Sequence, residues 1–127
     1  MDKNRELLLV DDDEGILENL ENIAKKFGYA SILMARTLDE AQKLMRIGQL
    51  VISDLGMGKG DDGLTLAREF KGQDGNIADF AIHSSSFTNN PGKDEIQLRK
   101  IFTDISDEIV IIPKLDRSVI DIFLDRE

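Results

Sequence analysis

Polar residues follow four short apolar segments of this sequence, and their types are those that handle phosphoryl groups and divalent cations. Asp11 and Asp12 follow the first segment, Asp54 ends another, Ser84 follows a third, and Lys114 comes after the last. A carboxylate can accept a phosphoryl group when other groups neutralise the charge that builds on the transferring oxygens. Grouped carboxylates repel one another, and a bound cation relieves that repulsion.

The acidic residues form the centre of the predicted site. If the apolar segments are neighbouring parallel strands, these side chains meet at one edge of a sheet, where ligands bind in open α/β folds. Asp54 is then the predicted phosphoryl acceptor. Asp11 and Asp12 are predicted to hold Mg²⁺ beside it, with Asp54 itself as a further ligand. Mg²⁺ takes oxygen ligands and keeps several waters, so two or three oxygens from the protein are enough. The backbone carbonyl of Gly56, two residues after Asp54, is expected as one of them.

Ser84 and Lys114 are predicted to bind the phosphoryl oxygens, the first through its hydroxyl and the second through its ammonium group. A structural role stays open for both, because serines commonly end strands and a lysine in this position can simply be solvated. His83 lies inside a predicted strand. We interpret it as a packed or surface residue and not as a phosphorelay histidine on an exposed helix.

Five strands alternating with helices would position these residues. Strands are expected over residues 5–10, 29–35, 50–53, 77–83 and 108–112. Helices are expected from Asp12 or Asp13 to Gly28, from Thr37 to Gly48, from Asp61 or Asp62 past Phe70, over about 93–104, and from about Asp116. Their starts carry capping residues, and two of their ends carry glycine. This alternation with short loops predicts a doubly wound α/β fold, a parallel sheet covered on both faces.

Composition narrows the function classes. A chain of 127 residues suits one domain, so we expect a single domain over 1–127 with no output domain attached. No cysteine and one histidine argue against disulfides and zinc sites, and a net charge of −9 disfavours direct contact with nucleic acid or anionic membranes. No apolar run is long enough to span a bilayer and the N-terminus lacks a signal-peptide core, so a cytoplasmic location is expected.

The chain resembles a response-regulator receiver domain over essentially its whole length. The residues that carry the resemblance are Leu8 to Asp13, Val51 to Met57, Asp62-Gly63-Leu64, Ser84-Ser85 and Lys114. The resemblance implies a flavodoxin-like (βα)5 sheet in the order 2-1-3-4-5 and Mg²⁺-dependent phosphorylation of Asp54 in two-component signalling. It implies a sensor histidine kinase or phosphotransfer protein as donor and a downstream protein as target. The chain itself would be a monomer or a weak homodimer.

Two departures from the receiver pattern concern the end of the last strand. Receivers usually carry lysine followed by proline there, whereas here Pro113 precedes Lys114, so either Lys114 is displaced by one residue or Ile112 occupies the usual lysine position. Residues 108–112 also contain no aromatic side chain, which in the family usually reports phosphorylation. The loop and helix after Ser84 are the expected switching elements.

Two alternatives stay open. A pseudo-receiver would keep the fold as an interaction module without being phosphorylated, in line with the departures around Pro113. A haloacid-dehalogenase-like phosphohydrolase would use Asp11 and Asp13 as its paired acids, but that reading leaves Asp54 unexplained. As a receiver, the chain is expected not to be an enzyme beyond its own phosphotransfer and autodephosphorylation.

Overall fold

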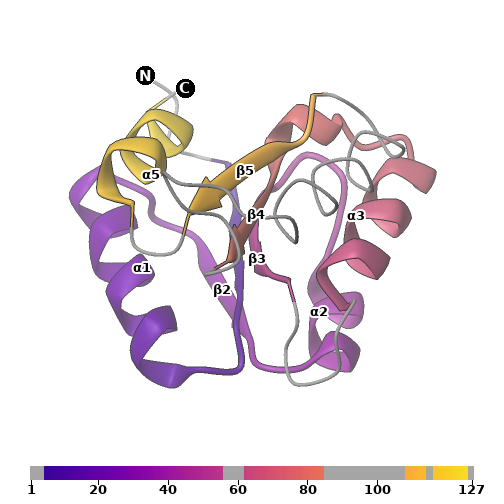
Figure 1. Cartoon of the computed structure of the whole chain (residues 1–127), viewed down its shortest axis with the longest axis horizontal. Coiled ribbons are helices and arrows are strands. Elements are labelled where there is room, and N and C mark those ends of the chain that lie inside the picture. Colours follow the sequence, from indigo (N-terminus) through magenta and orange to yellow (C-terminus); the bar gives the residue numbers. More distant parts are fainter. Residues whose placement is uncertain (1–4, 56–61, 85–107, 114–115, 126–127) are drawn as a thin grey trace, which may run out of the picture.

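Five parallel strands form one sheet in the computed structural model, which describes residues 5–55, 62–84, 108–113 and 116–125 (Figure 1). The strands are β1 (Leu7–Val10), β2 (Ile32–Ala35), β3 (Leu50–Asp54), β4 (Phe80–Ser84) and β5 (Val110–Pro113). The helices are α1 (Glu14–Lys26), α2 (Leu38–Leu44), α3 (Asp62–Gly72) and α5 (Arg117–Leu124), with a 3₁₀ turn, η1, over Ile77–Asp79. The sheet order is β2-β1-β3-β4-β5, which confirms the predicted flavodoxin-like order.

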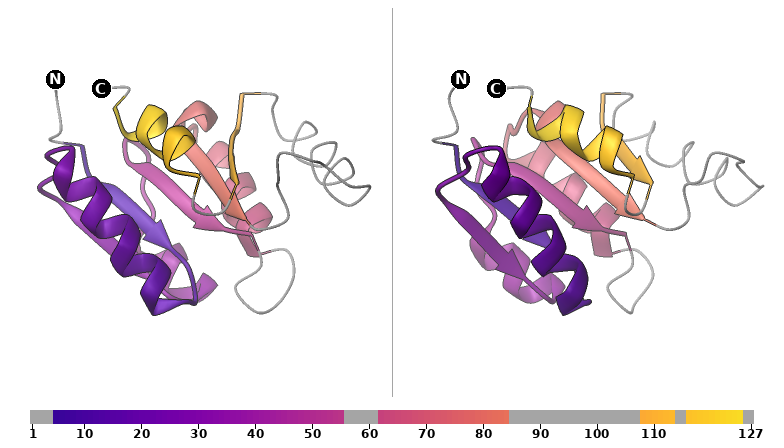
Figure 2. Two further views of the ribbon diagram at one scale, coloured as in Figure 1. Left: turned by 60° about the vertical axis from the view of Figure 1, so that its left-hand side comes forward. Right: turned by 90° about the vertical axis from the view of Figure 1, so that its left-hand side faces the viewer.

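Helices cover both faces of the sheet. α1 and α5 lie on one side, and α2 and α3 lie on the other (Figures 1 and 2). Each face has its own apolar core: Leu17 and Phe123 join the cluster under α1 and α5, whereas Ala41 and Phe70 join the cluster under α2 and α3. Because strand residues alternate between the faces, each central strand reads as a continuous apolar run, as expected for a sheet buried on both sides. No helix in the described part of the chain has the length and apolar character needed to cross a bilayer.

Local sequence signals account for the helix starts. Asp13 caps α1, where its carboxylate accepts hydrogen bonds from the backbone N–H groups of Gly15 (2.9 Å) and Ile16 (3.2 Å). Thr37 caps α2 by accepting from the N–H of Glu40 (3.1 Å), as its spacing predicts. Asp116, near which the last helix was predicted to start, is the capping residue of α5. These caps satisfy N–H groups that lack an intrahelical partner and therefore fix where each helix begins.

Several predicted boundaries are wrong. α2 ends at Leu44 and not at Gly48, since Met45 already has extended backbone angles. The fourth strand starts at Phe80, because Asn76 caps a 3₁₀ turn over the residues expected to begin it. β1 and β2 are shorter at their starts than expected, and β3, β4 and β5 each run one residue further at their ends. The helix expected over about 93–104 lies outside the described residues.

Candidate functional site

Asp11 is the most enclosed acid at the carboxyl edge of the sheet. It directly follows β1, only 1% of its surface is exposed, and its N–H donates to the Ala35 carbonyl of β2 at 3.1 Å. One carboxylate oxygen, Oδ1, accepts a hydrogen bond from the N–H of Asp13 at 2.9 Å. The sheet and the start of α1 therefore hold this side chain in a fixed place.

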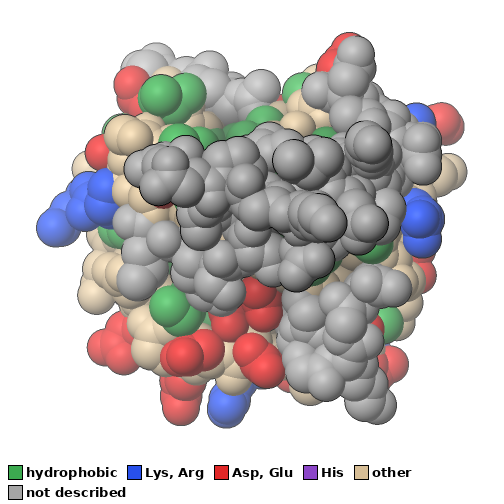
Figure 3. Space-filling view, viewed as in Figure 1, with side chains coloured by type: hydrophobic (Ala, Val, Ile, Leu, Met, Phe, Trp, Pro, Cys, Tyr) green, Lys and Arg blue, Asp and Glu red, His purple; other side chains and the backbone are tan. Residues whose placement is uncertain are grey.

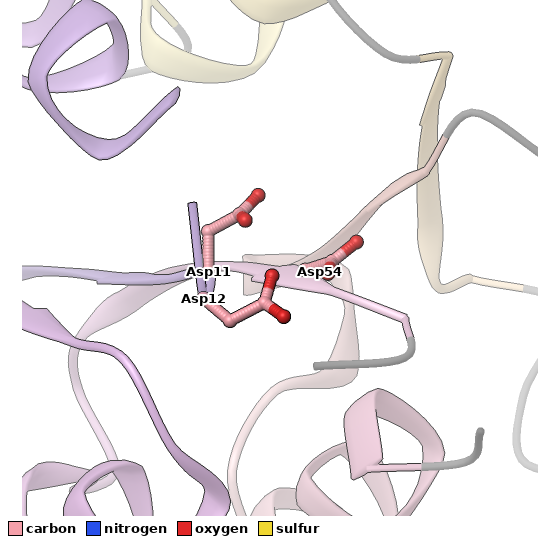
Figure 4. A group of neighbouring side chains, drawn as sticks. All are labelled: Asp11, Asp12 and Asp54. Atoms are coloured by element: carbon pink, nitrogen blue, oxygen red, sulfur yellow. The ribbon is translucent and has the colours of Figure 1, made fainter. Parts of the chain in front are cut away.

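Asp54 and Asp12 complete a group of three carboxylates. Asp54 is the last residue of β3, and the pairing of Val10 with Ser53 brings it beside Asp11. Asp12 is exposed and Asp54 is half-buried. One carboxylate oxygen from each of the three lies within 4.8 Å of the others. Figure 4 shows the three side chains converging from the ends of two neighbouring strands.

The electrostatics of this group favour a cation. Three negative charges at this spacing repel one another, and Asp11 is too enclosed for water to screen it well. Acidic side chains gather at the bottom of the face shown in Figure 3, on the side where α1 begins. Oxygen ligands from carboxylates are the set that Mg²⁺ and Ca²⁺ prefer. The three aspartates therefore fit the predicted Mg²⁺ site, and their binding of the ion stays a prediction.

The strand register places other residues in the same row as Asp54. Asp54 pairs with His83 of β4, and His83 pairs with Ile112 of β5. Ser84 lies one row further along, opposite Pro113, and is nearly buried. Alternation along β4 assigns Ser84 to the face covered by α2 and α3, so the role of its hydroxyl toward Asp54 stays a prediction.

Two predicted site residues, Gly56 and Lys114, lie outside the described residues. The structure does describe Ile112, the alternative occupant of the lysine position. Its side chain is fully buried in the core cluster under α1 and α5, in the row of Asp54 and His83. An apolar side chain there supplies no hydrogen-bond donor to the site.

Asp13 is separated in role from the other acids of its run. Its Oδ1 accepts both hydrogen bonds that cap α1, and it is not among the three grouped carboxylates. The phosphohydrolase alternative needs Asp11 and Asp13 as a working pair. Because the Asp13 carboxylate caps α1, the structure favours a structural role for Asp13 over a catalytic one.

Two residues that support the site, Gly63 and Arg36, were not among the predicted site residues, although Gly63 belongs to a motif that carries the receiver resemblance. The N–H of Gly63, at the start of α3, donates to the Leu55 carbonyl at 2.7 Å, and a Cβ at Gly63 would lie 2.5 Å from the Asp54 carbonyl oxygen. Arg36 follows β2 and donates through Nη2 to the Asp12 carbonyl at 3.4 Å. The place of Arg36 directly after a predicted strand was a usable signal. The close approach of Gly63 to Asp54 was not predicted, because it depends on how α3 packs.

Comparisons with known proteins find similar structures but no matching sequence family. No family model matches the chain, and no curated protein sequence matches it either. The signal receiver domain of an HD domain-containing protein from Pseudomonas fluorescens Pf-5 is 23% identical, with a TM-score of 0.67, over 94% of this chain and 83% of its own. A yeast Spc42 trimeric coiled-coil segment fused to another structure gives a TM-score of 0.71 at 16% identity, over 97% of this chain and 77% of its own. The chain therefore has the fold of a signal receiver domain.

Proposed function

We propose that this chain is a signalling switch that accepts a phosphoryl group on Asp54 in a Mg²⁺-dependent reaction. The donor is a phosphohistidine of a sensor histidine kinase or phosphotransfer protein, and phosphorylation changes the affinity for a downstream protein. The observation that supports this most is the grouping of Asp11, Asp12 and Asp54 within 4.8 Å at the carboxyl edge of a receiver-type sheet.

The proposed reaction exchanges one bond at phosphorus for another. A carboxylate oxygen of Asp54 forms the new O–P bond while the N–P bond of the donor breaks, and its electron pair stays on the donor imidazole nitrogen. Asp11 and Asp12 would hold Mg²⁺, which when bound neutralises negative charge on the transferring oxygens. Later attack by water on phosphorus breaks the O–P bond, releasing inorganic phosphate and restoring the carboxylate.

The edge location of Asp54 suits a reaction between two proteins. Asp54 is half-buried, so a donor can reach it, while the fixed Asp11 beside it stays in place. The residues expected to respond to phosphorylation follow Ser84 and lie outside the described part of the chain. We expect the response to be a population shift between two arrangements of that segment.

Mass spectrometry after incubation with Mg²⁺ and acetyl phosphate tests the proposal. One phosphoryl group should add to the wild-type chain, and none to Asp54→Asn. Asp12→Asn and Asp13→Asn form a matched pair, since each removes one charge from adjacent residues and asparagine still caps a helix. We expect labelling to slow by about tenfold or more in Asp12→Asn and to stay near wild type in Asp13→Asn. Labelling that survives in Asp54→Asn would contradict the proposal.

A second candidate function is an interaction module that keeps the fold and is never phosphorylated. Ile112 favours this function. It is one of the two candidates for the usual lysine position, and its buried apolar side chain stands in the row of Asp54. Absence of any phosphoryl adduct, with or without Mg²⁺, would support this module. Steady turnover of a generic phosphomonoester that depends on Asp13 would instead support a phosphohydrolase. It would contradict our proposal that the chain catalyses only the phosphotransfer to its own Asp54 and its own dephosphorylation.

A further inference from the structure

His83 is the one histidine of the chain, and it lies in β4, one residue before the carboxyl end of that strand. Its side chain is fully buried in β4, a strand that has neighbours on both sides. Burying a polar ring away from water is costly unless its nitrogens find hydrogen-bond partners. An aliphatic residue at this position would avoid that cost. A buried imidazole here therefore raises the question whether it serves the candidate site.

Strand alternation places His83 on the same face of the sheet as Asp54. Two residues before each of them stand Ala81 and Ile52, and both belong to the core cluster under α1 and α5. Since every second residue of a strand faces the same way, Asp54 and His83 also face α1 and α5. The residues between, Ser53 and Ile82, face the other side.

The register makes His83 the direct neighbour of Asp54. The two residues are paired between β3 and β4, so their backbones are about one inter-strand spacing, roughly 4.8 Å, apart. Ile112 follows in the same row on β5, at about twice that distance, and is apolar. Of the described residues on the β4 and β5 side of this row, His83 is the one with a side-chain N–H to donate.

We infer that the His83 imidazole is a hydrogen-bond donor of the Asp54 site, directed at the phosphoryl group that Asp54 carries in the proposed function. An N–H donor aimed at an oxygen that gains negative charge stabilises it most where water is excluded. His83 is fully buried beside Asp54, so its own ring is shielded from water on the donor side of that contact. Asp11 and Asp12 approach Asp54 from the β1 side and His83 from the β4 side, so the acceptor lies between a cation site and a donor.

The chain offers a direct spectroscopic readout, because a single histidine gives ring signals that need no further assignment. We would record the ¹H–¹⁵N correlations of the His83 ring and of the Asp54 backbone amide in the full chain. Spectra are compared in Mg²⁺ alone and after adding beryllofluoride, a mimic of the phosphoryl group. We expect both the ring N–H and the Asp54 amide signals to shift on that addition.

Variants separate hydrogen bonding from packing. In His83→Leu, labelling of Asp54 by acetyl phosphate should slow by about tenfold, the value of one hydrogen bond to a charged group. His83→Asn keeps an N–H donor and should recover most of that rate. Ile82→Ala is the matched control, since Ile82 is equally buried in the same strand but faces away from Asp54. Compared where all variants are folded, it should change the rate by less than about twofold.

The outcomes distinguish this inference from the function on which it rests. An Asp54 amide that shifts with beryllofluoride while the His83 ring does not would overturn the inference and leave phosphorylation standing. The same holds if His83→Leu and Ile82→Ala slow labelling equally, or if His83→Asn fails to recover the rate although it folds. If neither signal moves and no phosphoryl group adds to the wild-type chain, the proposed function itself fails.

Discussion

The two edges of this sheet use charged residues in opposite ways. At the amino edge, the guanidinium of Arg5 donates to Asp79 at 2.7 Å and to the carbonyls of Gly48 and Gln49. The Gln49 amide is buried there and donates to Glu6 at 2.7 Å. Opposite charges and donors meet acceptors at this edge, so its polar groups stabilise the fold.

At the carboxyl edge, three side chains of the same charge are brought together. Asp11, Asp12 and Asp54 place carboxylate oxygens within 4.8 Å of one another. Their mutual repulsion opposes folding until a cation binds. Polar contacts at the amino edge therefore stabilise the fold, whereas the grouped carboxylates at the carboxyl edge lower its stability locally. Such a local loss of stability is typical of a binding site.

The largest expected effect concerns the backbone contact that holds the carboxyl edge. In Gly63→Ala, the new Cβ would lie 2.5 Å from the Asp54 carbonyl oxygen and 2.9 Å from the Leu55 Cα, and neither backbone atom can turn aside. We expect a loss of about 3 kcal/mol in the free energy of unfolding, measured by urea titration. Gly72→Ala is the control, since no atom lies within 4 Å of its added Cβ. Equal losses in both variants would argue against a special role for the contact.

Breaking the amino edge should have the next largest effect. Arg5→Met keeps much of the aliphatic stem but removes the donors to Asp79, Gly48 and Gln49. We expect a loss of about 2 kcal/mol, because the partly buried Asp79 loses its ion pair with Arg5. Arg117→Met removes an exposed ion pair with Asp121 and should cost less than about 0.5 kcal/mol. A cost for Arg5→Met as small as this control would erase the contrast between the edges.

At the carboxyl edge, removing a charge should stabilise the protein when Mg²⁺ is absent. Asp54→Asn relieves repulsion with Asp11 and Asp12, so we expect a gain of about 1 kcal/mol in EDTA. Added Mg²⁺ should raise the melting temperature of the wild type and have much less effect on this variant. Asp39→Asn, at an exposed site paired with Lys43, should show neither effect. A wild-type melting temperature that Mg²⁺ leaves unchanged would count against the cation site.

The smallest expected effect is at the cap of α5, where Asp116 follows the carboxyl end of β5 but is not one of the three grouped aspartates. A hydrogen bond from the Ser118 hydroxyl, followed by one from the Val119 N–H, lowers the pKa of Asp116 below its ordinary value of 3.8. The stability contributed by its charge is therefore present above pH 3.8 and is lost as the pH falls through the lowered pKa. Asp116→Asn keeps a capping side chain, so the difference in stability between wild type and variant should shrink in this acid range. A difference that stays constant with pH would show that the charge does not matter.

The sequence by itself determined the elements and the positions of their charged ends. Apolar runs and capping residues predict the described strands and helices, and acids directly after β1 and at the end of β3 indicate the edge where a site would form. These signals act over a few residues, which explains why Asp13, Thr37 and Asp116 are found as caps. The predicted start of a strand was wrong where a local turn replaced it, as in the 3₁₀ turn that Asn76 caps before β4.

Only the tertiary structure decided which side chains are neighbours across strands. The pairing of Asp54 with His83 and of His83 with Ile112 depends on how three strands from separate parts of the chain align, which the pattern of any one strand does not give. The approach of Gly63 to Asp54 and the ties of Arg5 at the amino edge likewise join residues far apart in the chain. Such contacts depend on how the strands align and how the helices pack on them, so they appear only when the whole domain is assembled.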